Sequence, residues 1–148
     1  MTPTVRHAAR VLVIDNDGCV LLFRGFDPAR PEAGDWWFTP GGGIDGDESV
    51  ADAARRELYE ETGLAIDDLG PELFESRIIF EFEGKEFDQF ERFFCVRTPR
   101  FDLTHAGFEP HERRSVLEHR WWSGPELAAT AETIYPQDLA ERIARLLD

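Results

Sequence analysis

The chain has 148 residues, the length of one ordinary domain with a buried core, so we expect a single domain over residues 1–148. It carries 16 basic and 30 acidic residues, and the formal net charge of -14 disfavours binding to duplex nucleic acid or to an anionic membrane. The apolar run near the N-terminus, Val11–Ile14, is too short for a signal peptide or a membrane span. The two cysteines lack metal-binding spacing. These features predict a reduced, cytoplasmic protein.

The first half of the chain predicts a hairpin and then a helix. Val11–Ile14 and Cys19–Phe23 are short apolar runs on either side of an Asp-Gly turn, a pattern typical of two antiparallel strands. After a brief apolar segment, Pro40–Gly43 has the composition of a turn. The stretch from about Glu48 to Thr62 is rich in Ala, Glu, Arg and Leu and predicts a helix. Asp47 or Ser49 is its candidate N-cap, and Gly63 its C-terminal glycine.

The second half predicts two more strands, a loop and a mixed C-terminal region. Leu73–Phe82 and Phe87–Val96 are rich in aromatic and β-branched residues, which favours a second strand pair. Phe101–Arg114 has no clear period and is predicted to be a long loop. The rest predicts a strand, a helix opened by a capping box and an amphipathic helix, at Glu118–Trp122, at Ser123 with Glu126, and at Pro136–Leu147.

An acidic cluster lies on the predicted helix. At about 100° per residue, Glu57, Glu60 and Glu61 share one arc, and this arc continues the apolar face formed by Val50 and Ala54. Like charges at this spacing repel, and anions near a helix C-terminus oppose its dipole, so something must compensate. Three convergent carboxylates are what a hard cation such as Mg²⁺ binds. A glutamate pair by itself is more often a solvated helix end, and the surrounding residues decide between these interpretations.

The surrounding sequence has a fixed spacing. Gly42 is followed by five residues and Glu48, then by seven residues and the run Arg56-Glu57-Leu58-Tyr59-Glu60-Glu61-Thr62-Gly63-Leu64. This pattern resembles the Nudix box at every defining position. The resemblance implies an α/β fold, a Nudix-type α/β/α sandwich with a mixed β-sheet that covers most of the chain.

The resemblance also implies site residues and a cofactor. Glu57, Glu60 and Glu61 would be the ligands of Mg²⁺, with Mn²⁺ as a substitute. One of these glutamates, or a carboxylate outside the box, would deprotonate the attacking water, and for an outside carboxylate we favour Glu112 over Glu109 or Glu118. Arg56 can bind neighbouring carboxylates and fix their rotamers. Gly42 and Glu48 complete the predicted cofactor-binding set, the first by backbone freedom and the second by bracing the loop.

The implied activity is hydrolysis of the diphosphate bond of a nucleoside diphosphate joined to another group. The substrate would be a small nucleotide: a nucleoside triphosphate, a damaged nucleotide or a nucleotide sugar. Two alternatives remain at this point, a non-catalytic module that senses a nucleotide and an enzyme similar to isopentenyl diphosphate isomerase. The complete box argues against the first, and the apolar surroundings of Cys19 and Cys95 argue against the second. The sequence leaves a homodimer open.

Overall fold

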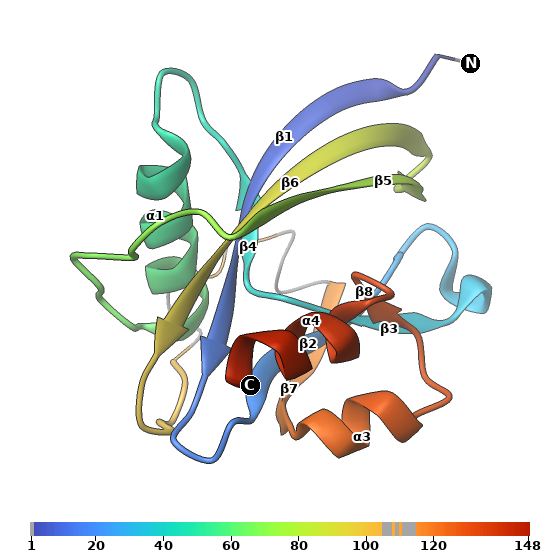
Figure 1. Cartoon of the computed structure of the whole chain (residues 1–148). Helices are drawn as coiled ribbons and strands as arrows, with labels where there is room; N and C mark the ends of the chain where they lie inside the picture. Colours follow the sequence, from blue (N-terminus) through green and yellow to red (C-terminus); the bar gives the residue numbers. More distant parts are fainter. Residues whose placement is uncertain (1, 105–107, 109, 111–114) are drawn as a thin grey trace.

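A mixed, curled β-sheet organises the chain in a computed structural model, which describes residues 2–104, 108, 110 and 115–148. Eight strands belong to this sheet: β1 Thr4–Ile14, β2 Val20–Phe26, β3 Asp35–Phe38, β4 Gly41–Gly43, β5 Phe74–Phe82, β6 Lys85–Arg97, β7 Val116–Trp122 and β8 Ile134–Tyr135. The described helices are the 3-10 turn η1 Pro31–Ala33, α1 Val50–Thr62, α3 Gly124–Ala129 and α4 Leu139–Leu147. Figure 1 shows α1 on one side of the sheet and α3 with α4 on the other.

The sheet combines parallel and antiparallel pairs in the order β5-β6-β1-β2-β3-β8, while β4 pairs with β1 and β7 pairs with β2. β1 and β6 run parallel over the whole length of β1, from Thr4 opposite Phe87 to Ile14 opposite Arg97. β5 and β6 form the predicted second hairpin, and its turn contains Gly84 with a φ of 81°. The long β1–β6 pair therefore joins the two hairpins into one sheet.

The first hairpin, β1 with β2, has its turn held by one buried carboxylate. Asp15 accepts hydrogen bonds from the backbone N–H groups of Asp17 and Cys19, at 2.9 and 2.8 Å. It also accepts one from Arg100 Nε at 2.8 Å. Gly18 in this turn has a φ of 81°, in the left-handed region that favours glycine. The predicted hairpin is confirmed.

Alternating side chains of the central strands fill two hydrophobic cores. On one face, Val11 and Val13 pack with Ala53, Ala54 and Leu58 of α1. On the other face, the neighbouring residues of β1 pack against α3 and α4, in a cluster with Leu12, Ile14, Trp37, Trp122, Leu127, Leu139 and Ile143. Successive side chains of a strand point to opposite faces of the sheet, so both faces are apolar and each is covered by helices.

The box helix α1 begins two residues later than predicted. Ser49 is the N-cap, and its side chain accepts a hydrogen bond from the backbone N–H of Asp52 at 3.1 Å. Gly63 ends the helix in the left-handed conformation, with a φ of 81°. Ala54 and Leu58 are fully buried and Val50 packs at the edge of their core, so the predicted packing face is confirmed.

The prediction of a turn at Pro40–Gly43 is wrong. Residues Gly41–Gly43 form β4, which pairs antiparallel with Ala8–Arg10 of β1. A Cβ atom on Gly41 would lie 2.1 Å from the Ala9 carbonyl oxygen, so only glycine allows this close approach. Three consecutive glycines have turn composition but no strand propensity, and the pairing with β1 overrides their local preference.

The C-terminal predictions are mostly confirmed. β7 starts at Val116, slightly before the predicted strand, and Ser123 and Glu126 form the predicted capping box of α3. α4 begins at Leu139 and not at Pro136, with Asp138 as its N-cap. Much of the predicted loop at Phe101–Arg114 lies outside the described residues. No helix in the described part of the chain is both long and apolar enough to cross a membrane.

Candidate active site

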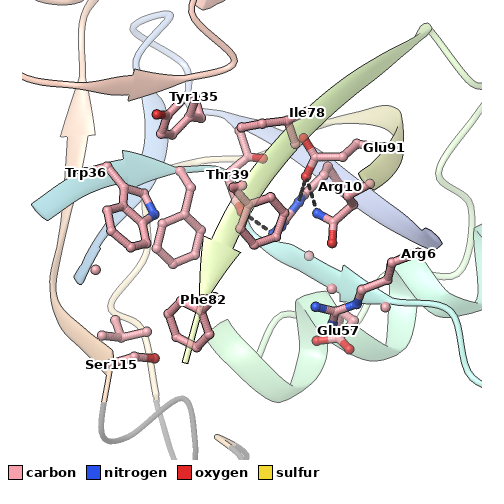
Figure 2. A pocket seen from close by; sticks show the side chains of 18 of the residues that line it. Arg6, Arg10, Trp36, Thr39, Glu57, Ile78, Phe82, Glu91, Ser115 and Tyr135 are labelled. Carbon is pink, nitrogen blue, oxygen red and sulfur yellow. Dashed lines mark hydrogen bonds and ion pairs between the residues drawn. The ribbon is translucent and has the colours of Figure 1, made fainter. Parts of the chain in front are cut away.

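A cavity of about 670 Å³ is lined by strands of the sheet, by the segment around η1 and by α1. Its walls come from β1, β5 and β6 on one side and from β3 on the other, and the acidic face of α1 closes one end. Figure 2 shows Trp36 and Phe82 at one side of the cavity and Arg6 with Glu57 at the other. The cavity therefore has a charged end and an aromatic end.

The acidic cluster of α1 forms the charged end. Glu57, Glu60 and Glu61 all line the cavity. The side chains of Glu57 and Glu60 are 12% and 24% exposed, and Glu61 is 3% exposed. They lie at this depth because they continue the buried face of Ala54 and Leu58 along the same helix. Part-buried carboxylates on a rigid helix are costly unless other groups neutralise them.

Arg56 neutralises part of this charge. Its guanidinium binds Glu48 through two hydrogen bonds, from Nε at 2.8 Å and from Nη2 at 3.0 Å. Nη1 donates to Glu57 at 3.1 Å and lies 3.3 Å from Glu60, and Nη2 donates to the Gly43 carbonyl at 3.1 Å. The hydrogen bonds with Glu48 raise the pKa of Arg56 and lower the pKa of Glu48. One arginine thus joins α1 to the loop before it and to β4.

The glycines of β4 bring backbone against the carboxylates. The Gly41 N–H donates a hydrogen bond to Glu61 Oε1 at 2.7 Å. A Cβ atom on Gly42 would lie 2.6 to 2.8 Å from the carboxylate atoms of Glu57, so that side chain fits only because Gly42 has none. Gly42 and Glu48, both predicted members of the site, therefore act on the positions of the carboxylates by different means.

The donor set suits a hard divalent cation, although its present rotamers do not form a closed cage. Three carboxylates at i, i+3 and i+4 of α1 face one cavity, and carboxylate oxygens are the ligands that Mg²⁺ and Mn²⁺ prefer. Among the described residues, no three acidic, histidine or cysteine side chains converge as a ready metal cage. Glu57 and Glu60 are turned toward Arg56, and Glu61 toward Gly41. Binding a cation here requires these carboxylates to turn from their present partners.

Two arginines of β1 also reach the cavity, and the sequence patterns did not identify them as site residues. Arg6 lies beside Glu57 in Figure 2, and its Nη2 would be 3.0 Å from a Cβ atom on Gly43. Arg10 Nε donates to Glu91 Oε2 at 2.7 Å. Burial alone would lower the pKa of Arg10, but the Glu91 carboxylate reverses this effect and raises it. The spacing of Arg6, Ala8 and Arg10 along one strand face was the available signal.

Three further arginines, Arg24, Arg77 and Arg92, are in ion pairs elsewhere. Arg77 binds Asp88 through two hydrogen bonds at 2.7 and 2.8 Å. Arg24 pairs with Asp35, and Arg92 pairs with Glu72. None of these three arginines is among the described residues that line the cavity. The cavity therefore draws its cationic side chains from Arg6, Arg10, Arg30 and Arg56.

Aromatic side chains form the far end of the cavity. Trp36 and Phe82 face each other edge to face, with ring centroids 6.5 Å apart, and Phe38, Phe80 and Tyr135 complete this wall. Phe87 is not among the described residues that line the cavity; its ring stacks on that of Phe80, with centroids 5.4 Å apart. An aromatic wall at the end of the cavity opposite the acidic cluster suits the flat face of a nucleobase.

The predicted carboxylates outside the box divide into two groups. Glu112, favoured as an outside acid, lies outside the described residues, and so does Glu109. Glu118 is half-exposed on β7 and lies 3.4 Å from Arg24 Nε. It is not among the described residues that line the cavity. Glu91, which sequence reasoning did not consider, is 6% exposed and does line it.

The comparison with family models agrees with this arrangement. A model of the NUDIX domain matches residues 4–145. The chain belongs to the Nudix family. The match covers both cavity walls and the whole of α1, so the Nudix box at positions 42–64 lies in its family context.

Individual Nudix relatives support the assignment. The chain is 33% identical over 135 residues to an RNA pyrophosphohydrolase of Acidiphilium cryptum, a match that covers 86% of this chain and 80% of that protein. It is 38% identical over 68 residues to the nucleoside triphosphatase NudI of Salmonella heidelberg. That match covers 45% of this chain and 48% of the relative, so the aligned part spans about half of NudI.

A solved Nudix structure confirms the predicted fold. The MutT protein of Methanosarcina mazei Go1 superposes with a TM-score of 0.72 at 23% identity, and the match covers 100% of this chain and 99% of that protein. The curled mixed sheet between helices is therefore the Nudix α/β/α fold. The family is one of hydrolases, and the chain is an enzyme of this family.

Proposed function

We propose that this enzyme is a Mg²⁺-dependent hydrolase of nucleoside diphosphate derivatives, with Mn²⁺ as an alternative cation. Water attacks one phosphorus of the diphosphate, the anhydride P–O bond breaks, and a nucleoside monophosphate and the phosphorylated remainder leave. One observation carries the proposal: a single cavity joins the three box carboxylates, the arginines of β1 and an aromatic wall. These parts match the cation, the phosphates and the base of such a substrate.

Glu57, Glu60 and Glu61 would hold the cation. A bound divalent cation neutralises diphosphate oxygens and lowers the pKa of a bound water. Arg56 positions the carboxylates, because its hydrogen bonds to Glu48 and to the Gly43 carbonyl tie the helix to the loop. The general base would be one of the three glutamates or Glu112, and the residue types do not distinguish among these four carboxylates.

The arginines and aromatic residues would bind the rest of the substrate. Arg6 and Arg10 face the cavity next to the acidic end, where they can neutralise phosphate oxygens that the cation does not reach. Trp36 and Phe82 stand at the opposite side, where a base can stack. We propose a small nucleotide as substrate: a nucleoside triphosphate, a damaged nucleotide or a nucleotide sugar. The relatives named as pyrophosphohydrolase and nucleoside triphosphatase support this class.

The isomerase alternative requires a cysteine at the reacting centre. Neither Cys19 nor Cys95 is among the described residues that line the cavity. Both are free thiols, and burial raises the pKa of each, which disfavours the reactive thiolate. A non-catalytic module that senses a nucleotide stays the second candidate. Measured turnover of nucleotides distinguishes it from the hydrolase. The single-domain organisation, the cytoplasmic location and a homodimer stay predictions.

Hydrolysis of a nucleotide panel tests the proposal. The wild-type enzyme is incubated with nucleoside triphosphates, oxidised nucleotides and nucleotide sugars, with Mg²⁺, with Mn²⁺ or with a chelator, and products are separated by chromatography. We expect a nucleoside monophosphate from at least one substrate class with either cation and none with the chelator. Inactivity toward the whole panel with both cations would favour the sensing module.

A further inference from the structure

A buried glutamine in the cavity wall has an unused hydrogen-bond acceptor. Gln89 of β6 is 2% exposed and lines the cavity. Its side-chain Oε1 has no hydrogen-bond partner in the described part of the protein. Buried polar atoms almost always have a partner, in the protein, in water or in a ligand. This acceptor therefore suits a donor that the described residues do not supply.

The orientation of the Gln89 amide is set by its neighbours. Gln89 Nε2 donates to Glu91 Oε2 at 3.0 Å, and the same carboxylate oxygen accepts from Arg10 Nε at 2.7 Å. Arg10 Nη1 in turn donates to the Thr39 carbonyl at 3.1 Å. An ionised carboxylate only accepts hydrogen bonds, so the amide must present its NH₂ group to Glu91. Oε1 consequently stays free for a donor.

Gln89 lies between the two ends of the cavity. In the sheet it stands opposite Arg6 of β1 on one side and opposite Ile78 of β5 on the other. Gly43 of β4 stands opposite Ala8 of β1, so it is two strands and two residues away from Gln89. Phe80, at the aromatic end, is one strand and two residues away. A nucleotide that extends from the acidic end to the aromatic wall passes over Gln89.

We propose that Gln89 Oε1 accepts a hydrogen bond from an N–H or O–H group of the nucleoside part of the substrate, which makes Gln89 a specificity-determining residue. This inference rests on the proposed function. Among the donors of a nucleoside, we assign this contact to the exocyclic amine of the base or to the 2′-hydroxyl of the ribose. A site built around a buried acceptor discriminates strongly against an analogue without the donor, because that analogue leaves the acceptor unpaired.

Matched substrate pairs test the inference. CTP and the triphosphate of 2-pyrimidinone riboside, which is cytidine without its 4-amino group, differ only in that amine, and CTP and dCTP differ only in the 2′-hydroxyl. In at least one pair we expect the wild-type kcat/KM to favour the donor-bearing member by about tenfold or more. In Gln89→Met, which has a similar length and no amide, we expect that ratio to fall to within about twofold of one.

A cavity variant without a hydrogen-bonding change is the control. Ile78→Val alters the volume next to Gln89, and we expect it to change both members of a pair alike and to preserve the ratio. If Gln89→Met gives no cooperative thermal transition, Gln89→Asn withdraws the amide by one methylene and should lower the same ratio. A wild type that discriminates in neither pair, or a ratio that survives both substitutions, would overturn the inference.

The experiments distinguish a wrong role for Gln89 from a wrong proposed function. If CTP, its 2-pyrimidinone analogue and dCTP are hydrolysed at equal rates, the hydrolase activity stands and the role of Gln89 is excluded. If none is hydrolysed, calorimetric titration with CMP, 2-pyrimidinone riboside monophosphate and dCMP measures the same contact without turnover. We then expect CMP to bind about tenfold more tightly than at least one of the other two. Equal binding, or no binding, counts against Gln89.

Discussion

Single residues of the charged end have two opposing roles, because the groups that suit a cation also strain the metal-free protein. Glu61 is the clearest case: it is 3% exposed in the last turn of α1, where a negative charge opposes the helix dipole. The Gly41 N–H, bonded to it at 2.7 Å, and the charge of Arg10 compensate part of the cost. Both partners come from strands, so the helix pattern alone did not reveal them.

The substitution Glu61→Gln separates the two roles. Gln Oε1 can still accept from Gly41, and the repulsion by Glu57 is removed, so the metal-free melting temperature should match or slightly exceed that of the wild type. Turnover should fall roughly a hundredfold or more, and the rise in melting temperature on adding Mg²⁺ should shrink. Melts with and without Mg²⁺, beside turnover, measure both effects. Near-normal activity with an unchanged metal-induced rise would exclude Glu61 as a ligand.

The close contact between Gly42 and the Glu57 carboxylate leads to a second prediction, for the substitution Gly42→Ala. In Gly42→Ala the new Cβ must displace the Glu57 carboxylate, which lies within 2.8 Å of its position. A side-chain end moves cheaply, so we expect a stability loss below about 1 kcal/mol and a fall in kcat of about tenfold or more. Gly124→Ala is the control, because nothing lies within 4 Å of its added Cβ. Equal effects of the two substitutions on kcat would contradict the role of Gly42.

Some secondary-structure elements are determined by residues close in the sequence, and others by pairing with distant strands. The hairpin turns, α1 and the capping box of α3 were predictable because their glycines and capping side chains act within a few residues. The strands β4 and β8 were not predictable from the sequence, since they form only through pairing with distant strands. The same holds for the site: the carboxylates of α1 follow from helical periodicity. Arg10 and Glu91 come together only through the parallel pairing of β1 with β6.

The turn between β1 and β2 predicts a pH dependence of stability. Burial raises the pKa of Asp15, but the N–H groups of Cys19 and Asp17 and the Arg100 guanidinium outweigh it and hold the pKa below its usual value. A depressed folded pKa stabilises the fold above the unfolded pKa of about 4, and this stabilisation is lost as the pH falls through the folded value. The ionised form of Asp15 therefore stabilises this hairpin at neutral pH.

We expect the difference in melting temperature between wild type and Asp15→Asn to be largest above about pH 5 and to narrow below about pH 4. Asp15→Asn keeps acceptors for the backbone but loses the ion pair with Arg100. Asp17→Asn, exposed in the same turn, is the control and should show no such narrowing. Parallel melting curves for wild type and Asp15→Asn over this range would contradict the account of the turn.

At the scale of the whole molecule, acidic groups outnumber basic groups both in the chain and around the site. The chain has a formal net charge of -14, and the site cavity is lined by four arginines and six carboxylates. A polyphosphate approaching this protein meets repulsion until cations neutralise it, which favours a substrate that arrives bound to Mg²⁺. The fold places the required groups together from both hairpins and α1, and this assembly underlies the proposed reaction.

The origin of the oxygen in the products tests the central claim most directly. The wild-type enzyme with Mg²⁺ and its best nucleotide substrate is run in H₂¹⁸O, and both products are analysed by mass spectrometry. We predict one ¹⁸O atom in a phosphate group of one product, because water attacks phosphorus, and no label when a chelator removes the cation. Label-free products, or turnover that persists in the chelator, would contradict a cation-dependent hydrolysis at this cavity.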